Sequence, residues 1–339
     1  MTGRERILAA FAGKPADRLP LMPITMMLSA DRLGVRYRQY ASDFKTLAEA
    51  QARIAEEFHF DHVSAISDPA RESSDLGAGV AWFDDQPPAI LESRALLAEK
   101  TSLAGLRIPD PSAGPRMSDR VRGVELLRRN VGREKLVEGW VEGPCALAAD
   151  LRGLNTLMLD FYDDPGFVRG LFDFVGETGL RFGLAQLNAG ADLIGVGDAA
   201  ASLIGPKFYR DFVLPYEKRL IQGLQAAGGL VRLHICGSTR KLFKDMASLG
   251  AELVDLDWMA PISEAREQMG ERQTLAGNID PVRVLRDGTP DSIAAALAEC
   301  HRQARIRYIV CAGCEVPRGT PEANLRAMTC YAETHTQNL

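Results

Sequence analysis

His234 and Cys236 stand two residues apart at the end of the mostly apolar run Leu230–Leu233. In a β-strand, side chains two residues apart project from the same face, so this imidazole and this thiol would share one side of a sheet. Both groups are ligands that Zn²⁺ prefers, and a third ligand from elsewhere would leave a fourth position open, as in catalytic zinc sites. Taken alone, the pair is better explained by a core strand, because free cysteine is among the most buried residue types.

Short β-branched and apolar runs alternate with longer helix-patterned segments, which is typical of βα units that build a parallel sheet. The expected strands are Leu19–Thr25, Phe60–Asp68, Leu136–Gly143, Asp192–Asp198, Leu230–Cys236, Glu252–Trp258, Gln273–Asp280 and Tyr308–Cys314. Eight parallel strands close a (β/α)₈ TIM barrel. The sequence therefore predicts an α/β protein with a single (β/α)₈ barrel domain over residues 1–339, and an extra N-terminal helix over Thr2–Phe11.

An insertion follows the second expected strand. Gly79–Trp82 and Ala89–Arg94 flank Asp84–Pro88, a pattern typical of a two-stranded hairpin. At the C-terminal end of a barrel strand, such a segment would lie over the active site as a partial lid. A surface loop without a role in catalysis explains the same pattern.

Polar side chains end the expected strands, at the edge where barrel enzymes have their active sites. These residues are Asp68, Glu142, Asp198, His234, Cys236, Asp257, Asn278, Asp280 and Cys314. So many ligand-type and acidic residues at one edge are stronger evidence than the His–Cys pair alone. Cys314 ends the last expected strand, so we expect it to be the third zinc ligand, with His234 and Cys236.

Two acidic residues among these strand ends are candidates for catalysis. We expect Asp198 to orient the substrate or supply a proton, and capping of the following helix is the alternative role. Glu142 is a second candidate catalytic residue. Glu315, directly after Cys314, would be either a displaceable fourth ligand or an exposed loop carboxylate.

The six cysteines are too few for a disulfide scaffold in a chain of 339 residues. Cys311 and Cys314 form a C-x-x-C pattern, but they close the strand-like run Tyr308–Val310 instead of opening a helix. On an extended strand, residues three apart face opposite sides. We therefore expect Cys311 to point outward into the helix layer and to bind no metal.

Composition excludes several classes of function. A formal charge of −5 does not indicate the positively charged surface that binds nucleic acid. No apolar run approaches the ~18 residues that a membrane span needs. The N-terminus lacks the apolar segment of a signal peptide, so we expect a cytoplasmic protein that binds neither nucleic acid nor membranes.

Several motifs resemble the uroporphyrinogen decarboxylase superfamily, over nearly the whole chain. The matching stretches are Arg4–Phe11, Gly143–Pro144, Gly190–Asp192, Gly197–Asp198, Pro206–Tyr209, Phe212–Tyr216, Gly277–Pro281, Gly313–Cys314 and Gly319–Asn324. The resemblance implies a (β/α)₈ barrel, in agreement with the strand count.

Within that superfamily, the chain is more similar to the zinc methyltransferase branch than to the decarboxylases. That branch, which includes the methylcobamide:coenzyme M methyltransferases and the corrinoid methyltransferases of demethylation systems, binds zinc through H-x-C and a late cysteine. His234, Cys236 and Cys314 match this pattern. The decarboxylase motif M-R-Q-A-G-R-Y is absent at Met26–Arg32, and Gly313–Glu315 replaces the decarboxylases' G-H-G.

Two features are instead similar to the decarboxylases. Asp68 matches their essential aspartate, and Leu256–Trp258 also resembles their sequence. A metal-free decarboxylase of the uroporphyrinogen type is therefore the alternative function. A barrel that keeps a structural zinc and only binds a ligand is a third.

The resemblance implies a zinc-dependent methyltransferase that moves a methyl group between a small methylated substrate, such as a methoxyarene, methanol or a thiol, and a corrinoid (cobalamin). The chain has no D-x-H-x-x-G signature of a cobalamin domain, so the corrinoid would be supplied by a separate corrinoid protein. The methyl donor, the methyl acceptor, the direction of transfer and the fourth ligand remain open. So does the oligomeric state, with a homodimer as one option.

Overall fold

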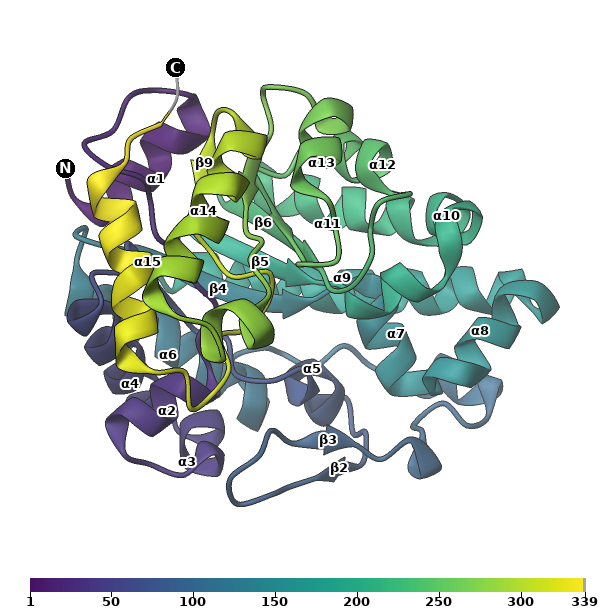
Figure 1. Cartoon of the computed structure of the whole chain (residues 1–339). Coiled ribbons are helices and arrows are strands. Elements are labelled where there is room, and N and C mark those ends of the chain that lie inside the picture. Colours follow the sequence, from purple (N-terminus) through teal and green to yellow (C-terminus); the bar gives the residue numbers. More distant parts are fainter. Residues whose placement is uncertain (338–339) are drawn as a thin grey trace.

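A curled parallel sheet forms the centre of the computed structural model, which describes residues 1–337 (Figure 1). Its strands are β1 (His62–Ser64), β4 (Leu136–Glu142), β5 (Leu193–Gly197), β6 (Leu230–Ile235), β7 (Leu253–Leu256), β8 (Thr274–Ala276) and β9 (Tyr308–Ile309). They are hydrogen-bonded neighbours in this order, and every pair is parallel. Each of these strands lies within an expected strand, so the α/β class and the parallel sheet are as predicted.

The first expected strand, Leu19–Thr25, is not a strand in the structure. Leu21 forms a single isolated parallel bridge with Val310. Pro20 and Pro23 have no N–H group to donate, which prevents a longer ladder on this segment. The sheet therefore has seven strands within the described residues. One bridge, at Val310 directly after β9, joins it to the Leu21 segment.

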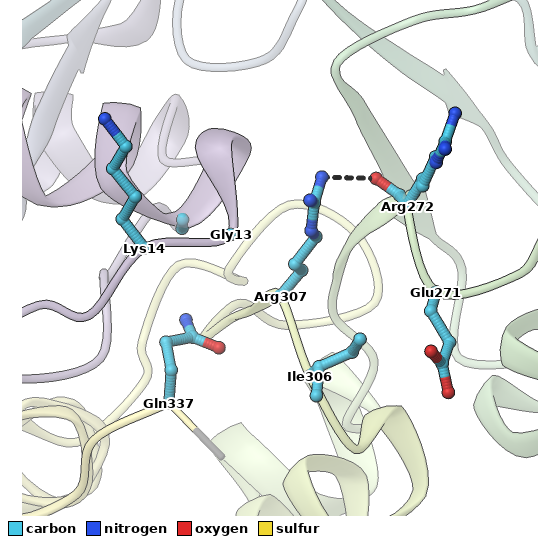
Figure 2. Close-up of a pocket in the computed structure, with 8 residues that line it drawn as sticks. Gly13, Lys14, Glu271, Arg272, Ile306, Arg307 and Gln337 are labelled. Carbon is cyan, nitrogen blue, oxygen red and sulfur yellow. Dashed lines mark hydrogen bonds between the residues drawn. The ribbon is translucent and has the colours of Figure 1, made fainter. Parts of the chain in front are cut away.

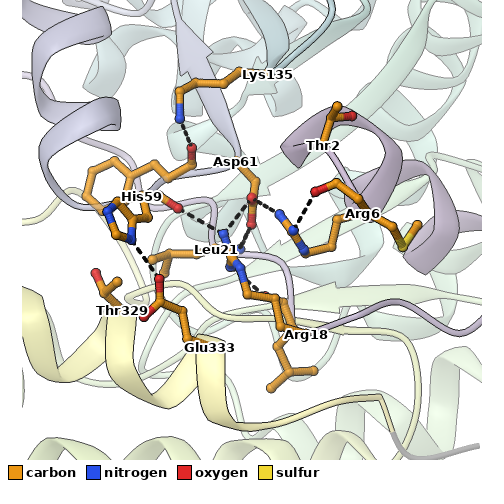
Figure 3. A network of polar contacts seen from close by, with 12 residues as sticks. Thr2, Arg6, Arg18, Leu21, His59, Asp61, Lys135, Thr329 and Glu333 are labelled. Carbon is orange, nitrogen blue, oxygen red and sulfur yellow. Dashed lines mark hydrogen bonds and ion pairs between the residues drawn. The ribbon is translucent and has the colours of Figure 1, made fainter.

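A buried carboxylate fixes the Leu21 segment against the other edge of the sheet (Figure 3). Asp61, directly before β1, donates its N–H to the Leu21 carbonyl at 3.0 Å and accepts the Leu21 N–H at 2.7 Å. The same carboxylate accepts hydrogen bonds from Arg6, on helix α1 (Gly3–Ala12), and from Arg18 at 2.9 Å. Asp61 thus joins the N-terminal helix, the Leu21 segment and β1.

Helices surround the sheet (Figure 1). After α1 they are α2 (Met27–Leu33), α3 (Tyr37–Ser42), α4 (Phe44–Glu57), α5 (Ala70–Asp75), α6 (Pro115–Val131), α7 (Pro144–Arg152), α8 (Leu154–Asp163), α9 (Pro165–Asn188), α10 (Gly205–Phe208), α11 (Leu214–Ala226), α12 (Phe243–Ser248), α13 (Ile262–Met269), α14 (Pro290–Ala304) and α15 (Glu322–Thr334). Short 3₁₀ or π segments are η1 (Glu92–Arg94), η2 (Lys100–Gly105), η3 (Ala199–Leu203), η4 (Tyr209–Val213) and η5 (Pro281–Arg286). In residues 1–337, none of these helices has the length and apolar character that crossing a membrane requires.

Helix α4 illustrates how the local sequence sets these elements. Asp43 caps its N-terminus by accepting the backbone N–H groups of Lys45 and Thr46. Leu47 and Ile54, seven residues apart and therefore on one face of the helix, are both fully buried. Helix α4 packs against helices α2 and α6.

A short antiparallel hairpin lies in the sequence between β1 and β4. Its strands β2 (Val80–Ala81) and β3 (Ala89–Ile90) pair Val80 with Ile90. Its turn is held in place by Asp85, which accepts the Tyr37 N–H at 3.1 Å and whose carbonyl accepts Arg318 Nη1 at 3.0 Å. The hairpin is thus attached to both the N-terminal and the C-terminal parts of the chain.

Strand alternation divides the sheet into two faces with separate apolar clusters. The face toward the helices carries Val137, Ile194, Val231, Val254, Leu275 and Val310. The inner face carries Leu136, Leu193, Leu253, Ala276, Ile309 and Cys311. Helix α1 packs against the inner cluster through Ile7 and Ala10.

The expected orientation of Cys311 is wrong. Its Sγ lies 3.7 Å from Arg232 Nη2 and donates to the Met22 carbonyl at 3.3 Å, so the side chain points inward and not into the helix layer. The expectation assumed one regular strand as far as Cys314. Strand β9 ends at Ile309 and only isolated bridges follow it, so alternation cannot be counted across that segment.

Candidate metal centre

Three of the predicted residues meet at the C-terminal edge of the sheet. His234 is the fifth residue of β6, Cys236 follows β6 directly, and Cys314 follows β9. One ligand atom from each lies within 4.8 Å of the other two. His234 Nε2 is 3.1 Å from Cys236 Sγ, and the two sulfur atoms are 3.9 Å apart.

The spacing of these donors fits a tetrahedral zinc ion. A disulfide would bring the sulfur atoms to about 2.05 Å, so both thiols are free. With Zn–S bonds of about 2.3 Å, tetrahedral geometry places two sulfur ligands about 3.8 Å apart, close to the observed separation. Two thiols and one imidazole are also the donor set of some catalytic zinc sites, which keep one position for a substrate.

Proton sharing within the cluster prepares it for a cation. The hydrogen bond from Cys236 lowers the pKa of the Cys314 thiol to about 4 and raises the pKa of Cys236 above its usual value. Burial alone would lower the pKa of His234, but Asp255 and Cys236 raise it well above its usual value. The cluster therefore already carries one thiolate at neutral pH.

The cluster faces a small cavity of about 140 Å³. Its lining residues are Ile24, Met26, Ile66, Asp68, Pro69, Arg71, Trp140, Glu142, Gly197, Ala199, His234, Cys236, Cys314 and Glu315. The apolar members are Ile24 and Met26 in or near the Leu21 segment, Ile66 and Pro69 after β1, Trp140 on β4 and Ala199 at the start of η3. A small substrate held here would contact an apolar wall on one side and acidic or ligand groups on the other.

Trp140 forms much of the apolar wall and requires glycine on the neighbouring strand. A Cβ atom added to Gly195 would lie 2.1 Å from the indole ring, and one added to Gly197 would lie 3.0 Å from it. The two glycines of β5 thus leave the space that the indole occupies. Trp140 and Glu142, two residues apart on β4, project from the same face of the sheet.

Glu142 faces the cavity in a form suited to hold a proton. It is 8% exposed, and its Oε1 accepts Arg71 Nη2 at 2.8 Å. Burial raises its pKa well above the usual value, although Arg71 acts in the opposite direction. Asp68 differs: burial would raise its pKa, but Arg116, whose Nη2 lies 2.5 Å away, helps to keep it below the usual value.

Asp198 does not line this cavity. Its buried carboxylate accepts the N–H groups of Cys145 at 3.1 Å and Ala146 at 2.6 Å, at the start of helix α7. Burial raises its pKa to about 6. The residue caps α7, which comes earlier in the chain, and not the helix that follows it. Its catalytic role remains a prediction, because the carboxylate is engaged away from the cluster.

The other polar strand ends stabilise turns. Asp257 accepts the Met259 N–H at 2.8 Å, and Asn278 donates to the Asp257 carbonyl at 3.0 Å. Asp280 caps η5. Glu315 lines the cavity and accepts the Met27 N–H at 2.9 Å, so it is not an exposed loop carboxylate.

Sequence reasoning missed three residues around the centre. Trp140 carried a signal, because it alternates with Glu142 on an expected strand. Arg71 lies on the short helix α5 and had no pattern to mark it. Asp255 contacts His234 from the adjacent strand β7, and only the register between the two strands shows this.

A second cavity, of about 550 Å³, adjoins the first and shares Pro69, Glu142 and Ala199 with it. The hairpin borders it through residues 87–90, and Asp150 and Leu203 lie on other sides. The hairpin therefore lies beside the approach to the metal centre, where a lid would lie.

A third cavity, of about 320 Å³, lies at the opposite end of the strands (Figure 2). Its lining includes Lys14 after α1, Arg272 just before β8 and Arg307 just before β9. Arg307 Nη1 is engaged with the Arg272 carbonyl at 2.7 Å. The N-terminal ends of barrel strands usually serve stability, so this cavity is not the candidate site.

The model of the uroporphyrinogen decarboxylase (URO-D) family matches residues 2–335. The chain belongs to the URO-D family. This confirms the resemblance drawn from the motifs, and the match includes the metal centre as well as both edges of the sheet.

Within the URO-D family, the chain is similar to two kinds of enzyme. A methylcobamide:CoM methyltransferase, MtbA, from Methanosarcina mazei is 28% identical over 345 residues, covering 98% of each chain. A uroporphyrinogen decarboxylase from Synechococcus sp. (strain CC9605) is 27% identical over 337 residues, covering 94% of this chain and 93% of the other. Sequence identity alone does not separate the two activities.

A solved structure of a methyltransferase from Methanosarcina mazei has the same fold. It superposes with a TM-score of 0.89 at 22% identity and covers 98% of both chains. A B12-independent methionine synthase from Shewanella sp. W3-18-1 is more distant, with a TM-score of 0.58 at 14% identity over 93% of this chain and 95% of the other. Both likenesses concern the fold.

Proposed function

We propose that this protein is a zinc-dependent methyltransferase, which moves a methyl group between a small methylated substrate and a corrinoid carried by a partner protein. The observation that carries the proposal is the His234–Cys236–Cys314 cluster, whose donors are spaced for zinc and face a cavity. The relatives named as methylcobamide:CoM methyltransferases support it. In this proposal residues 1–339 act as one domain.

The residues of the chain have separate roles in this reaction. His234, Cys236 and Cys314 hold the metal, and the apolar wall around Trp140 excludes water from the reacting methyl group. Zinc held in this way supplies a Lewis acid that activates a thiol or an ether for methyl transfer. Glu142, whose pKa burial raises, donates a hydrogen bond or a proton to the oxygen that loses the methyl group when an ether or methanol is the methyl donor.

A metal-free decarboxylase is the second candidate, because Asp68 lines the same cavity. Asp68 matches the decarboxylases' essential aspartate, but here Arg116 and Ser67 both engage its carboxylate. A porphyrinogen carries many carboxylates and needs several cations around it. Arg71 is the one arginine among the residues that line the cavity, which favours the methyltransferase.

Metal content is the direct test of the zinc site. We expect about one zinc per chain in protein purified without added metal, measured by elemental analysis, and loss of most of it in Cys314→Ala. Cys311→Ala is the matched control, because its thiol contacts Arg232 and the Met22 carbonyl and lies outside the cluster. Full zinc retention by Cys314→Ala would reject the ligand assignment.

Activity is the second test. Wild-type protein should transfer methyl groups between free cobalamin and members of a panel of methoxyarenes, methanol and thiols, and His234→Ala should not. Circular dichroism and thermal melting should show that the variant remains folded, because the apolar strands supply the stability. A well-folded His234→Ala protein with wild-type transfer rates would defeat the mechanism. Decarboxylation of a porphyrinogen after metal removal would establish the second candidate.

A further inference from the structure

A buried ion pair on the inner face of the sheet lies directly behind the candidate metal centre. It joins Arg232 on β6 to Asp255 on β7, and Asp255 also contacts His234. We propose that Asp255, fixed by Arg232, is a positioning residue that holds His234 in the orientation and tautomer that a metal ligand needs. This inference rests on the proposed zinc site.

The contact between Asp255 and His234 is set by the sheet. The two residues are register partners across the parallel strands β6 and β7. His234 Nδ1 lies 3.1 Å from Asp255 Oδ2 and 3.2 Å from the Asp255 carbonyl, while Nε2 lies 3.1 Å from Cys236 Sγ. The ring therefore has one nitrogen toward acceptors only and the other toward the cluster.

This arrangement selects one tautomer. Asp255 offers oxygen acceptors to Nδ1, so Nδ1 carries the proton and donates it. Nε2 is then left with a lone pair directed at the metal position. When the second nitrogen of a histidine ligand donates to a carboxylate, the ring is held in one orientation. The ligand is also more basic than one without this partner.

Arg232 in turn fixes Asp255. Its Nη2 and Nε donate to the same oxygen, Asp255 Oδ2, at 2.6 Å and 3.1 Å. Arg232 and His234 are two residues apart on β6 and so project from one face. The arginine is also held by Glu138, whose Oε1 lies 3.3 Å from Nη1. All three charged side chains are at most 1% exposed.

Stability alone does not account for this pair. Removing ions from water costs so much free energy that well-packed apolar residues are often as stabilising as a buried ion pair. The inner face of the sheet nearer its N-terminal end is apolar, with Leu136, Leu193 and Leu253. Two residues further along β4 and β7, charged side chains replace the apolar ones, and one of them, Asp255, contacts His234.

Zinc affinity tests the inference without measuring activity. Asp255→Asn keeps the size of the side chain but weakens the acceptor for Nδ1, and we expect zinc to bind about 10- to 100-fold more weakly in competition with a chelator. Glu138→Gln is the matched control. Glu138 is the other acid that binds Arg232, and it does not contact His234. Its replacement should therefore change the zinc affinity by less than about twofold.

Unchanged zinc affinity in Asp255→Asn would overturn the inference, as would equal losses in both variants. Wild-type protein that binds no zinc would instead overturn the proposed function, so the two failures are distinguishable.

A measurement on the wild type covers the case in which a variant does not fold. Nitrogen-15 spectra of the five histidine rings should show, for His234 in zinc-loaded protein, a protonated Nδ1 and a metal-bound Nε2. Metal on Nδ1 would overturn the inference.

Discussion

Asp61→Asn tests whether the junction between the Leu21 segment and β1 stabilises the whole sheet. The carboxylate is 2% exposed and accepts hydrogen bonds from Arg6, Arg18 and the Leu21 N–H. Asparagine has one acceptor oxygen in place of two and carries no charge. Arg6, whose side chain is 7% exposed, would lose its buried counter-charge.

The expected loss of stability is large for the replacement of one oxygen atom by an amide nitrogen. Breaking a buried ion pair costs about 3–5 kcal/mol, and the low end applies here because Arg6 also pairs with Asp17 and because Arg18 reaches the surface. An unfolding entropy of about 2.1 cal/mol/K per residue gives about 0.7 kcal/mol/K for a chain of this length. A loss of about 3 kcal/mol therefore lowers Tm by about 4 °C.

Thermal unfolding followed by circular dichroism measures this change, and Asp17→Asn is the matched control. Asp17 binds the same arginine, but it is 44% exposed. Exposed ion pairs contribute at most about 1 kcal/mol, so the control should melt within about 1–2 °C of the wild type. If Asp61→Asn melts no lower than Asp17→Asn, the reasoning about the buried junction is wrong.

Three further outcomes are expected. Protein in free zinc at about 1,000 Kd should melt about 6 °C higher than protein whose zinc a chelator has removed, because binding at that excess contributes about 4 kcal/mol to the free energy of unfolding. Glu142→Gln should slow methyl transfer by about 10²- to 10⁴-fold while zinc content stays at the wild-type level, because the amide cannot supply a proton. Burial, with a contribution from Glu72, raises the pKa of Asp150 to about 8. In the folded state Asp150 therefore keeps a proton that it loses above about pH 4 in the unfolded state. The free energy of unfolding consequently falls as the pH rises from about 4 to about 8. Asp150→Asn cannot ionise, so its Tm relative to the wild type should increase over that window.

Each of these outcomes has a result that contradicts it. A Tm that is insensitive to chelator in zinc-loaded protein would exclude a tightly bound ion. Normal transfer by Glu142→Gln would show that the carboxyl group is not a proton donor. A constant Tm difference between Asp150→Asn and the wild type from pH 4 to pH 8 would mean that Asp150 titrates at its ordinary pKa.

The sequence was sufficient where side-chain periodicity and chemistry point to the same residues. His234 and Cys236 lie on one face because of strand alternation, and Cys314 was found because it ends the last expected strand. The parallel sheet followed from apolar runs that alternate with helix-patterned segments.

The sequence was insufficient where the backbone departs from regular geometry. Two prolines prevent the Leu19–Thr25 segment from forming a strand, although its apolar pattern predicts one. Cys311 lies on the same inner face as Ile309, and it was misplaced because regular alternation does not continue from it to Cys314. The roles of Asp198 and Asp255 depend on which strand or helix lies beside them, and that information is not local to either residue.

The bridge between Leu21 and Val310 joins segments from nearly opposite ends of the chain. During synthesis, the chain through Val310 must leave the ribosome before the N-terminal segment can pair with it. Until then, the edge of β1 and the groups around Asp61 lack a covering neighbour, and unpaired strand edges are prone to aggregation. We expect ribosome-bound fragments that stop before β9 to remain sensitive to protease and to associate with chaperones, and protection to appear only with the last strand. The sheet is thus completed only after its last strand has left the ribosome.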